Sequence, residues 1–166
     1  MEAIRDAEAG DADRCLELAQ ELVGGLGSQR GGRLLLADAG FTSEDVTGVE
    51  WFMALLEDPD GKVMMGTLDG AVCGMGMGHI VSLPDGRPLG HLDVCYVEPD
   101  ARGVGLGRLL LDGVVGWFND RGCVGVDGLA LPGDREAKNF FEAAGFKARL
   151  LTMHRASETP PPRRPD

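Results

Sequence analysis

The chain has 166 residues, 43% of them hydrophobic, which is enough to bury the core of one domain. Its 16 basic and 27 acidic residues give a formal net charge of -11, which argues against direct binding to nucleic acid, because duplex binding depends on basic patches. This acidic balance suits a cationic substrate. We expect a single domain over residues 1–155 and a disordered, proline-rich tail over residues 156–166.

The four cysteines and three histidines are scattered along the chain, without a C-x-x-C pair or a Cys/His cluster, so we expect no metal site. The cysteines lie in apolar stretches, which is typical of buried free thiols in a reducing compartment. The sequence has no recognisable signal peptide and no apolar run long enough for a membrane span. These features predict a cytoplasmic protein without membrane contact. The oligomeric state stays open, a homodimer included.

The N-terminal part of the chain predicts an edge strand and a helix. Glu2–Arg5 has the length of a short strand, and Asp11 or Asp13 can cap the helix that follows. The apolar residues of this helix recur at helical spacing: Cys15, Leu18, Ala19, Leu22, Val23 and Leu26. The glycine-rich stretch over residues 24–32 should break the helix.

A second helix is predicted after residues 33–41, which fit no single pattern. It should begin at Thr42, where Asp45 stands three residues on as in a capping box. Its apolar residues are Val46, Val49, Phe52, Met53 and Leu56. The following Asp-Pro-Asp-Gly stretch, residues 58–61, predicts a turn.

Three strands are predicted next, over residues 62–68, residues 71–83 and the stretch that ends at Val97. Asp69-Gly70 is a strong signal for a two-residue hairpin between the first two, and Pro84–Arg87 predicts the second turn. We therefore expect an antiparallel meander.

The C-terminal part predicts helix, strand, helix and strand. After a glycine-rich turn, an apolar helix should run to about Asp120, and a strand over Cys123–Leu131 should lie parallel to the strand before the turn. Asp134 should cap a last helix that ends at Gly145, and Phe146–His154 should form a final strand. The order predicts an α/β fold of the mixed α+β kind, with a central mixed, largely antiparallel sheet flanked by helices.

The glycine-rich turn has the features of a phosphate cradle. Three glycines at alternate positions, Gly103, Gly105 and Gly107, stand between a strand and a helix whose first N–H groups are unpaired. Arg102 and Arg108 flank the turn and can add charge-assisted hydrogen bonds. The spacing does not fit the dinucleotide fingerprint G-x-G-x-x-G, because Arg108 or Leu110 stands where the last glycine should be. It does not fit a P-loop, because the chain has no Gly-Lys-Ser or Gly-Lys-Thr.

What remains, V-x-P-x-x-R-G-x-G-x-G, resembles the acyl-CoA motif of the GNAT family of N-acetyltransferases. Arg102, Gly105 and Gly107 match the family pattern Q/R-x-x-G-x-G/A position for position. The resemblance extends from about Leu92 to Phe146, and it is faint at the start of the chain. It implies a GNAT-like acyltransferase fold and an enzyme that transfers an acetyl group from acetyl-CoA, or from a close acyl-CoA, to a primary amine of a small molecule or peptide.

The resemblance also implies where the co-substrate lies. In the family the turn holds the pyrophosphate of CoA, and the backbone before it runs beside the pantetheine arm. Carried over to this chain, the contacts fall on Cys95, Tyr96, Val97, Arg102, Gly103, Val104, Gly105, Leu106, Gly107 and Arg108. Asp134 takes the position of the family's asparagine at the start of the last helix.

Acyl transfer to an amine needs a group that accepts a proton, because a free alkylamine has a pKa of about 10.4. His91 and Asp93 lie two residues apart on the strand before the turn, and therefore on the same face. Acidic or histidine side chains at these positions act as base in several branches of the family. Asp93 is our first candidate for the base and His91 the second. The alternatives are a structural carboxylate and a polar residue at a strand edge.

Two neighbouring residues have weaker claims to a catalytic role. Cys95 could form an acyl-enzyme, but a small buried side chain is the simpler interpretation. Tyr96 is the only tyrosine of the chain, and strand alternation should direct it away from the face that carries Asp93. We therefore expect it to pack.

One departure from the family pattern bears on turnover. The tyrosine that commonly protonates the departing thiolate in the family is replaced by Phe141. Phe141 favours, as alternatives, slow turnover or an acyl-CoA-binding regulatory module with little catalysis. A third hypothesis is an unrelated nucleotide-binding protein. The acidic residues expected near the acceptor, Glu44, Asp45, Glu50 and Glu57, would suit an amine.

Overall fold

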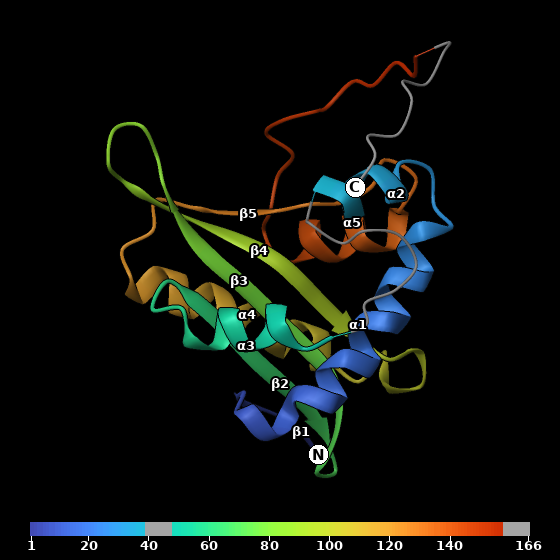
Figure 1. The fold of residues 1–166 in the computed structure, drawn as a ribbon, viewed down its shortest axis with the longest axis vertical. Coiled ribbons are helices and arrows are strands. Elements are labelled where there is room, and N and C mark those ends of the chain that lie inside the picture. The colour runs from blue at the N-terminus through green and yellow to red at the C-terminus, as the bar shows by residue number, and fades with distance from the viewer. Residues whose placement is uncertain (39–47, 158–166) are drawn as a thin grey trace.

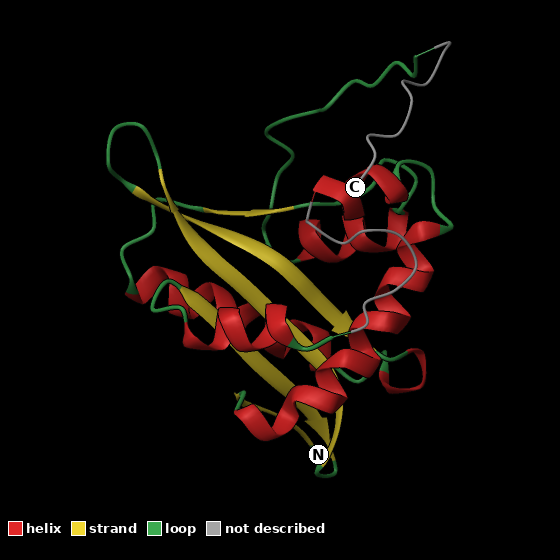
Figure 2. Cartoon of the chain, in the orientation of Figure 1, coloured by secondary structure: helices red, strands yellow, loops and turns green. Residues whose placement is uncertain are grey.

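The computed structural model describes residues 1–38 and 48–157, which form one five-stranded sheet with helices on both faces (Figures 1 and 2). The strands lie in the order β1-β2-β3-β4-β5. They are β1 (Glu2–Asp6), β2 (Gly61–Leu68), β3 (Ala71–Ser82), β4 (Pro88–Val97) and β5 (Val126–Gly128). The helices are α1 (Ala12–Gly27), α2 (Gly32–Asp38), α3 (Glu50–Glu57), α4 (Leu106–Asp120) and α5 (Arg135–Ala143). None of these helices is long and apolar enough to cross a bilayer.

The predicted mixed, largely antiparallel sheet is confirmed. Strands β1 to β4 pair antiparallel in sequence order, and β5 joins β4 in parallel after the crossover through α4. Asp69 and Gly70 both have positive φ, 49° and 87°, as the tight turn between β2 and β3 requires. The predicted edge strand, meander and motif helix are present as well.

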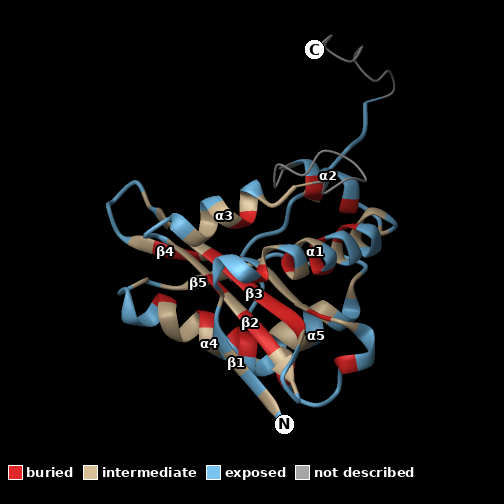
Figure 3. Cartoon of the chain, turned by 60° about the horizontal axis from the view of Figure 1, so that its bottom comes forward, coloured by how far each residue is buried: buried red, intermediate tan, exposed pale blue. Residues whose placement is uncertain are grey.

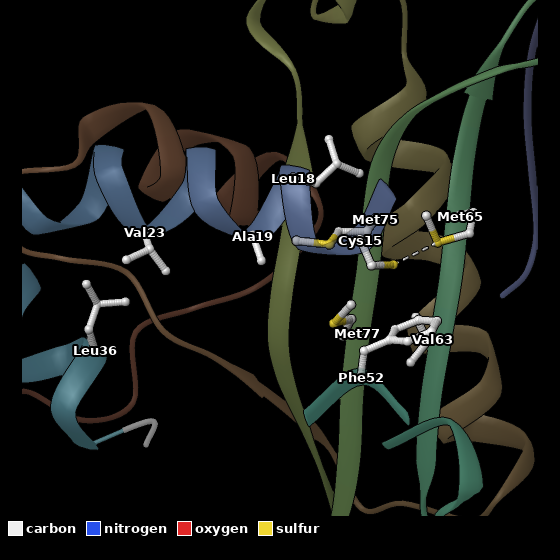
Figure 4. Close-up of a cluster of buried hydrophobic side chains, with 10 residues drawn as sticks. All are labelled: Cys15, Leu18, Ala19, Val23, Leu36, Phe52, Val63, Met65, Met75 and Met77. Atoms are coloured by element: carbon white, nitrogen blue, oxygen red, sulfur yellow. Dashed lines mark hydrogen bonds between the residues drawn. The ribbon is translucent and has the colours of Figure 1, made fainter. Parts of the chain in front are cut away.

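One face of the sheet carries the larger core, between the strands and helices α1 and α3 (Figure 4). Methionines from the middle of the sheet pack there against Phe52 of α3 and against the apolar stripe of α1, and the Cys15 thiol donates to the sulfur of Met65 at 3.5 Å. The predicted α1 spacing is confirmed by its buried residues, Cys15, Leu18, Ala19 and Val23. α1 ends at Gly27, within the glycine-rich stretch that was predicted to break it.

Asp11 stands at the start of α1, but its carboxylate does not cap the helix. It accepts two hydrogen bonds from the Arg5 guanidinium, both at 2.7 Å, and one from the N–H of Glu8. The guanidinium holds the pKa of this carboxyl below its usual range. The ion pair ties β1 to the beginning of α1.

α4 packs against the other face of the sheet (Figure 3). Several glycines of β2, β3 and β4 face α4 there. A Cβ added at Gly78 or Gly90 would come within 2.6 Å of the Phe118 ring, and one at Gly76 within 3.1 Å of Val114. Gly66 and Gly74 leave similar room for Leu110. The space beside the alternating glycines of β3 is therefore filled by α4 side chains.

Two strand predictions differ from the structure. The predicted strand over Cys123–Leu131 is reduced to Val126–Gly128, the residues in register with Gly90–Leu92 of β4. Just before them, Val124 and Gly125 each make one backbone hydrogen bond to β4. The predicted final strand over Phe146–His154 was wrong, because the segment has no regular secondary structure. Phe146 packs on Phe141, and the chain then extends with three large apolar side chains exposed by 74% to 89%, those of Leu150, Leu151 and Met153. The three-residue β5 gives a further strand too little edge to pair with.

Some predictions fall partly outside the described residues. The expected helix start at Thr42 lies there, and in the described part α3 begins at Glu50. The ambiguous residues 33–41 are helical in α2 as far as Asp38. Of the predicted tail, residues 156 and 157 are described and have no regular secondary structure.

Two glycine substitutions test the close approach of α4. Gly90→Ala should lower the free energy of unfolding by about 1–3 kcal/mol, because the added methyl overlaps the Phe118 ring. Gly116→Ala, within α4 and with no atom near its Cβ position, should raise it by up to about 1 kcal/mol through helix propensity. Urea unfolding monitored by circular dichroism measures both. Equal stability of the two variants would contradict this packing.

Candidate functional site

Strands β4 and β5 separate after a short paired stretch (Figure 1). Gly90–Leu92 pair with Val126–Gly128, and β4 then continues to Val97 without a partner residue on β5. The edge of β4 over residues 93–97, on the side away from β3, is called the open edge below.

The hydrogen-bond phase of β4 shows which backbone groups face the open edge. Just beyond β4, the N–H of Glu98 donates to the carbonyl of Cys73 at 2.9 Å, so Glu98 faces the β3 side. Because backbone groups alternate along an antiparallel strand, the N–H groups of Cys95 and Val97 point to the open edge. The carbonyl of Val97 points to the open edge as well, and it accepts a hydrogen bond from Nε of Arg102 at 2.9 Å.

The glycine-rich turn leads from β4 into α4 with its backbone exposed. Gly103 and Gly105 have φ of 82° and 97°, which disfavour any side chain, and a Cβ at either would meet no atom within 4 Å. The first hydrogen bond of α4 runs from Leu109 N–H to the Gly105 carbonyl. The N–H groups of residues 106–108 therefore have no partner within the helix, and with the helix dipole they make this terminus suited to an anion.

The two arginines beside the turn are held in different ways. Arg102 bonds to the Val97 carbonyl, lies with its guanidinium 5.7 Å from the centre of the Tyr96 ring and is 3.8 Å from Glu136. It thus stays at the mouth of the turn. The Arg108 guanidinium instead reaches along α4 to Asp112 at 2.8 Å and to the carbonyl of Ala143 at 3.0 Å. Arg108 therefore offers the turn its backbone N–H, while its side chain joins α4 to the end of α5.

The other residues expected at the co-substrate site differ in what they expose. Val104 is 44% exposed at the tip of the turn, whereas the side chain of Leu106 is buried in the core. The Asp134 carboxylate caps α5 by accepting from the N–H of Ala137 at 2.9 Å, which confirms the predicted cap. Its other oxygen lies 3.4 Å from the Gln29 amide.

The open edge begins at an irregularity in β4. Met77 pairs with Val94 and Gly78 with Leu92, so Asp93 stands opposite no residue of β3 and forms a β-bulge. The bulge changes the alternation of β4 at the residue where β5 leaves it.

Asp93 and two histidines gather on the face of the bulge that carries α1 and α3. The Asp93 carboxylate lies 2.6 Å from Nδ1 of His79, and the rings of His79 and His91 are 5.4 Å apart. The structure thus brings the two predicted candidates, His91 and Asp93, together with a third residue. Burial raises the pKa of the Asp93 carboxyl, and the bond from His79 opposes this rise.

His79 was missed in the sequence analysis, although the signal was present. Ser82 pairs with Pro88 across the predicted turn. Three residues farther from the turn on each strand, His79 stands opposite His91. The bond between His79 and Asp93 could not be read from the sequence, because it depends on the bulge.

The bulge also corrects the prediction for Tyr96. The bulge adds one residue to β4 and so reverses the alternation of side chains after Asp93. Val94 and Tyr96 therefore pack with the α1 and α3 core, on the face that holds Asp93. The Tyr96 hydroxyl donates to the Glu21 carboxylate of α1 at 3.0 Å. The expectation that Tyr96 and Asp93 lie on opposite faces was therefore wrong, whereas the expected packing of Tyr96 is observed.

Cys95 faces α4 and has the character of a structural thiol. Its sulfur lies 3.6 Å from the carbonyl of Gly107, and burial raises the pKa of the thiol to about 12. A thiol that stays protonated at neutral pH is a poor nucleophile. The geometry disfavours the acyl-enzyme alternative.

Phe141 lies over the last paired residue of β5. A Cβ at Gly128 would come within 2.9 Å of Cζ of the Phe141 ring, and Gly128 pairs with Leu92 where the two strands separate. The ring edge therefore stands beside the beginning of the open edge, with no proton to donate.

The comparisons with known proteins agree with this arrangement. The model of a family described as the acetyltransferase (GNAT) family matches residues 33–146. No curated protein matches the chain. Within the described residues, no group of three or more His, Cys, Asp or Glu side chains could hold a metal ion.

Solved structures share the fold at low sequence identity. A putative acetyltransferase from Agrobacterium tumefaciens is 21% identical, with a TM-score of 0.71, over 93% of this chain and 99% of that one. A ribosomal-protein-alanine N-acetyltransferase from Brucella melitensis is 17% identical, with a TM-score of 0.68, over 94% and 99%. An aminoglycoside acetyltransferase from an uncultured soil metagenomic sample is 16% identical, with a TM-score of 0.68, over 96% and 97%.

The raised pKa of Asp93 gives a prediction for stability. The folded state holds this proton more tightly than the unfolded chain, whose aspartate pKa is about 3.9, so the ionised carboxylate weakens folding as pH rises through its titration. Asp93→Asn should therefore be at least as stable as the wild type at pH 7, and its relative stability should decline as the pH is lowered to 4. Urea unfolding over this pH range measures the difference. A variant less stable by more than about 1 kcal/mol at pH 7 would show a structural carboxylate instead.

Proposed function

We propose, since this chain belongs to the GNAT acetyltransferase family, that it transfers an acetyl group from acetyl-CoA to a primary amine by direct attack of the amine. The family match supports an acyltransferase, and the geometry of the site supports the finer assignment. The observation that carries it is the continuity of three features along β4: the glycine-rich turn, the open edge and the bulge at Asp93.

The turn is suited to the pyrophosphate of CoA. Its exposed backbone at Gly103 and Gly105 allows close approach, and the N–H groups of residues 106–108 can donate to phosphate oxygens. Arg102 adds a positive charge at the mouth of the turn. These donors fit a dianionic group in spite of the net charge of -11.

The open edge is suited to the pantetheine arm. The N–H groups of Cys95 and Val97 can pair with an extended amide chain as a neighbouring strand would. About 13 Å of strand separates Val97 from Asp93 at the usual rise per residue. A linear arm that starts at the turn would thus bring its reactive end to the bulge, where β5 no longer covers β4.

The bulge supplies the groups that handle the proton of the amine. Asp93, with His91 and His79 beside it, can accept that proton directly or through a water molecule. An N–H at the start of the open edge can donate to the acyl oxygen as negative charge develops there. Bound acetyl-CoA supplies the activated acyl group, and its thiolate leaves without a strong acid because a thiol has a pKa of about 8.5.

A primary amine is the acceptor class that the surrounding charge favours. The turn before β2 carries Asp58 and Asp60, and the carbonyl of Asp60 accepts from Ile80 N–H, next to His79. Glu57 is exposed at the end of α3. These carboxylates would attract an ammonium group to the bulge. All four cysteines are free, which suits a reducing compartment such as the cytoplasm.

A second candidate function follows from Phe141. Without a proton donor at this position, the chain could bind acyl-CoA as a regulatory module and turn it over slowly or not at all. A panel of amines that never accelerates CoA release, in spite of tight cofactor binding, would favour this module over the enzyme.

Substitution of Val104 tests the phosphate cradle. Val104→Glu should weaken acetyl-CoA and CoA binding at least about tenfold, or about 1.4 kcal/mol, because it adds a like charge beside the pyrophosphate. Because the Val104 side chain is exposed, the substitution leaves the core intact and a loss reports on binding. Val104→Gln is the control of matched size and should bind as the wild type does.

Thermal-shift titrations with acetyl-CoA, CoA and ADP measure this effect. A ligand at 100 times its Kd adds about 2.7 kcal/mol to folding stability, which raises the unfolding midpoint clearly. Equal shifts for the Glu and Gln variants would place the pyrophosphate elsewhere. A shift with ADP as large as with CoA would support the nucleotide-binding alternative.

Restoring a phenol at position 141 tests the missing acid. Phe141→Tyr should increase kcat by up to about 10²-fold, the lower end of what a positioned general acid contributes, because its hydroxyl would extend from Cζ at the point where β4 and β5 separate. Phe140→Tyr, one residue earlier in α5, is the control and should have no such effect. Unchanged kcat in Phe141→Tyr would show that thiolate departure is not limited by protonation.

A further inference from the structure

The pair formed by His79 and Asp93 extends the expected site to a second strand. Asp93 lies on β4, which leads into the glycine-rich turn, whereas His79 lies on β3. Nδ1 of His79 lies 2.6 Å from Oδ2 of Asp93, while the His91 ring stands 5.4 Å from that of His79. Both side chains of the pair are a little over one third exposed, 37% and 38%. The pair is therefore formed within the protein and is still accessible to a substrate.

The contact determines which ring nitrogen carries the proton. An ionised carboxylate can only accept a hydrogen bond, so Nδ1 of His79 must be the donor. In the neutral imidazole the other nitrogen, Nε2, then has a free lone pair. A histidine oriented by a carboxylate in this way is the arrangement that hydrolases use for their general base.

We propose that Nε2 of His79 accepts the proton of the attacking amine, and that Asp93 acts as the positioning residue that holds the ring. An imidazole, with an ordinary pKa of about 6.5, is a stronger base near neutral pH than an aspartate carboxyl, with about 3.9. A general base works best when its pKa lies near the operating pH. The inference rests on the proposed acyl transfer, and it refines the assignment of Asp93.

The charged groups around His79 come from several elements. On β4 they are Asp93 and His91, and on β5 Asp127 lies beside His91 and is bound by Arg149. Lys62 on β2 is turned away and bonds to Asp6. At the end of α3 and in the following turn stand the exposed carboxylates Glu57, Asp58 and Asp60. The Arg121 guanidinium donates to the Pro59 carbonyl in the same turn. The other groups are mostly acidic, which favours a cationic amine.

The step balances without another reactant. The amine nitrogen forms a bond to the acyl carbon as the carbon–sulfur bond breaks, and the electron pair of that bond leaves with the thiolate. His79 takes the proton lost by the nitrogen at Nε2 and keeps its Nδ1–H on Asp93. It returns the extra proton to solvent, from which the thiolate is protonated.

The pH dependence of kcat/KM with a reactive amine tests this assignment. For the wild type we expect an inflection between pH 6 and 7, the range of an imidazole, and not between pH 4 and 5, the range of a carboxylate. His79→Gln should lower kcat by about 10²–10⁴-fold and abolish the inflection. Asp93→Asn should lower kcat as well, and should move the inflection to lower pH because the imidazolium loses its carboxylate.

His154→Gln is the matched control, because His154 is exposed in the C-terminal segment without regular secondary structure. It should keep the rate and the inflection. His91→Gln separates the two neighbouring rings, and it should keep the inflection because His91 lacks the bond to Asp93. Loss of the inflection only in Asp93→Asn, or only in His91→Gln, would overturn the role of His79 and leave acyl transfer intact. Thermal shifts with CoA should be unchanged in all of these variants, so a loss of cofactor binding would point to the proposed function instead.

A tautomer measurement tests the pair even if no reactive amine is found. In the ¹⁵N spectrum of the histidine rings at pH 8, with His79 assigned from His79→Gln, Nδ1 should carry the proton and Nε2 should be bare. Asp93→Asn should weaken this preference. A wild-type His79 protonated at Nε2 would contradict the proposal, whether or not the chain turns over acetyl-CoA.

Discussion

The close approach of α4 to the sheet is the constraint on which the site depends. Glycines at five positions of β2, β3 and β4 leave a surface without side chains, and Leu110, Val114 and Phe118 of α4 occupy it. A helix pressed onto the sheet in this way has little freedom to slide or tilt. Its N-terminus, and with it the glycine-rich turn, is held at the end of β4.

The bulge at Asp93 is the second constraint, and it acts in the plane of the sheet. It coincides with the last residues that β5 pairs with, so the backbone becomes accessible where the side chains of Asp93 and His79 meet. Burial raises the pKa of this carboxyl, which means that its ionised form weakens the folded state. Carboxylates whose ionised form destabilises the folded state are typical of functional sites. The same stretch of β4 thus connects a helix terminus suited to an anion with a pair suited to proton transfer.

Much of the fold could be predicted from local patterns. The Asp69-Gly70 turn, the Asp134 cap and the strands of the antiparallel meander are each specified within a few residues, and all are present. The glycine-rich turn was recognisable for the same reason, since its backbone geometry depends on the local residues Gly103 and Gly105.

The errors arose where distant residues decide the outcome. The segment after Phe146 has an alternating pattern but lacks a strand edge long enough to pair with. Tyr96 was assigned to the wrong face, because a bulge is set by the pairing of two strands and not by the sequence of one. The bond between His79 and Asp93 depends on that bulge, so alternation along β4 alone could not have predicted it.

The central claim is that a turn suited to CoA and a pair suited to proton transfer act together on an amine. It is tested most directly by incubating the wild-type protein with acetyl-CoA and a library of primary amines, followed by mass spectrometry. The account predicts that at least one amine gains the mass of an acetyl group, and that His79→Gln loses this product while still binding CoA. Tight binding of acetyl-CoA without any acetylated amine across the library would contradict the claim.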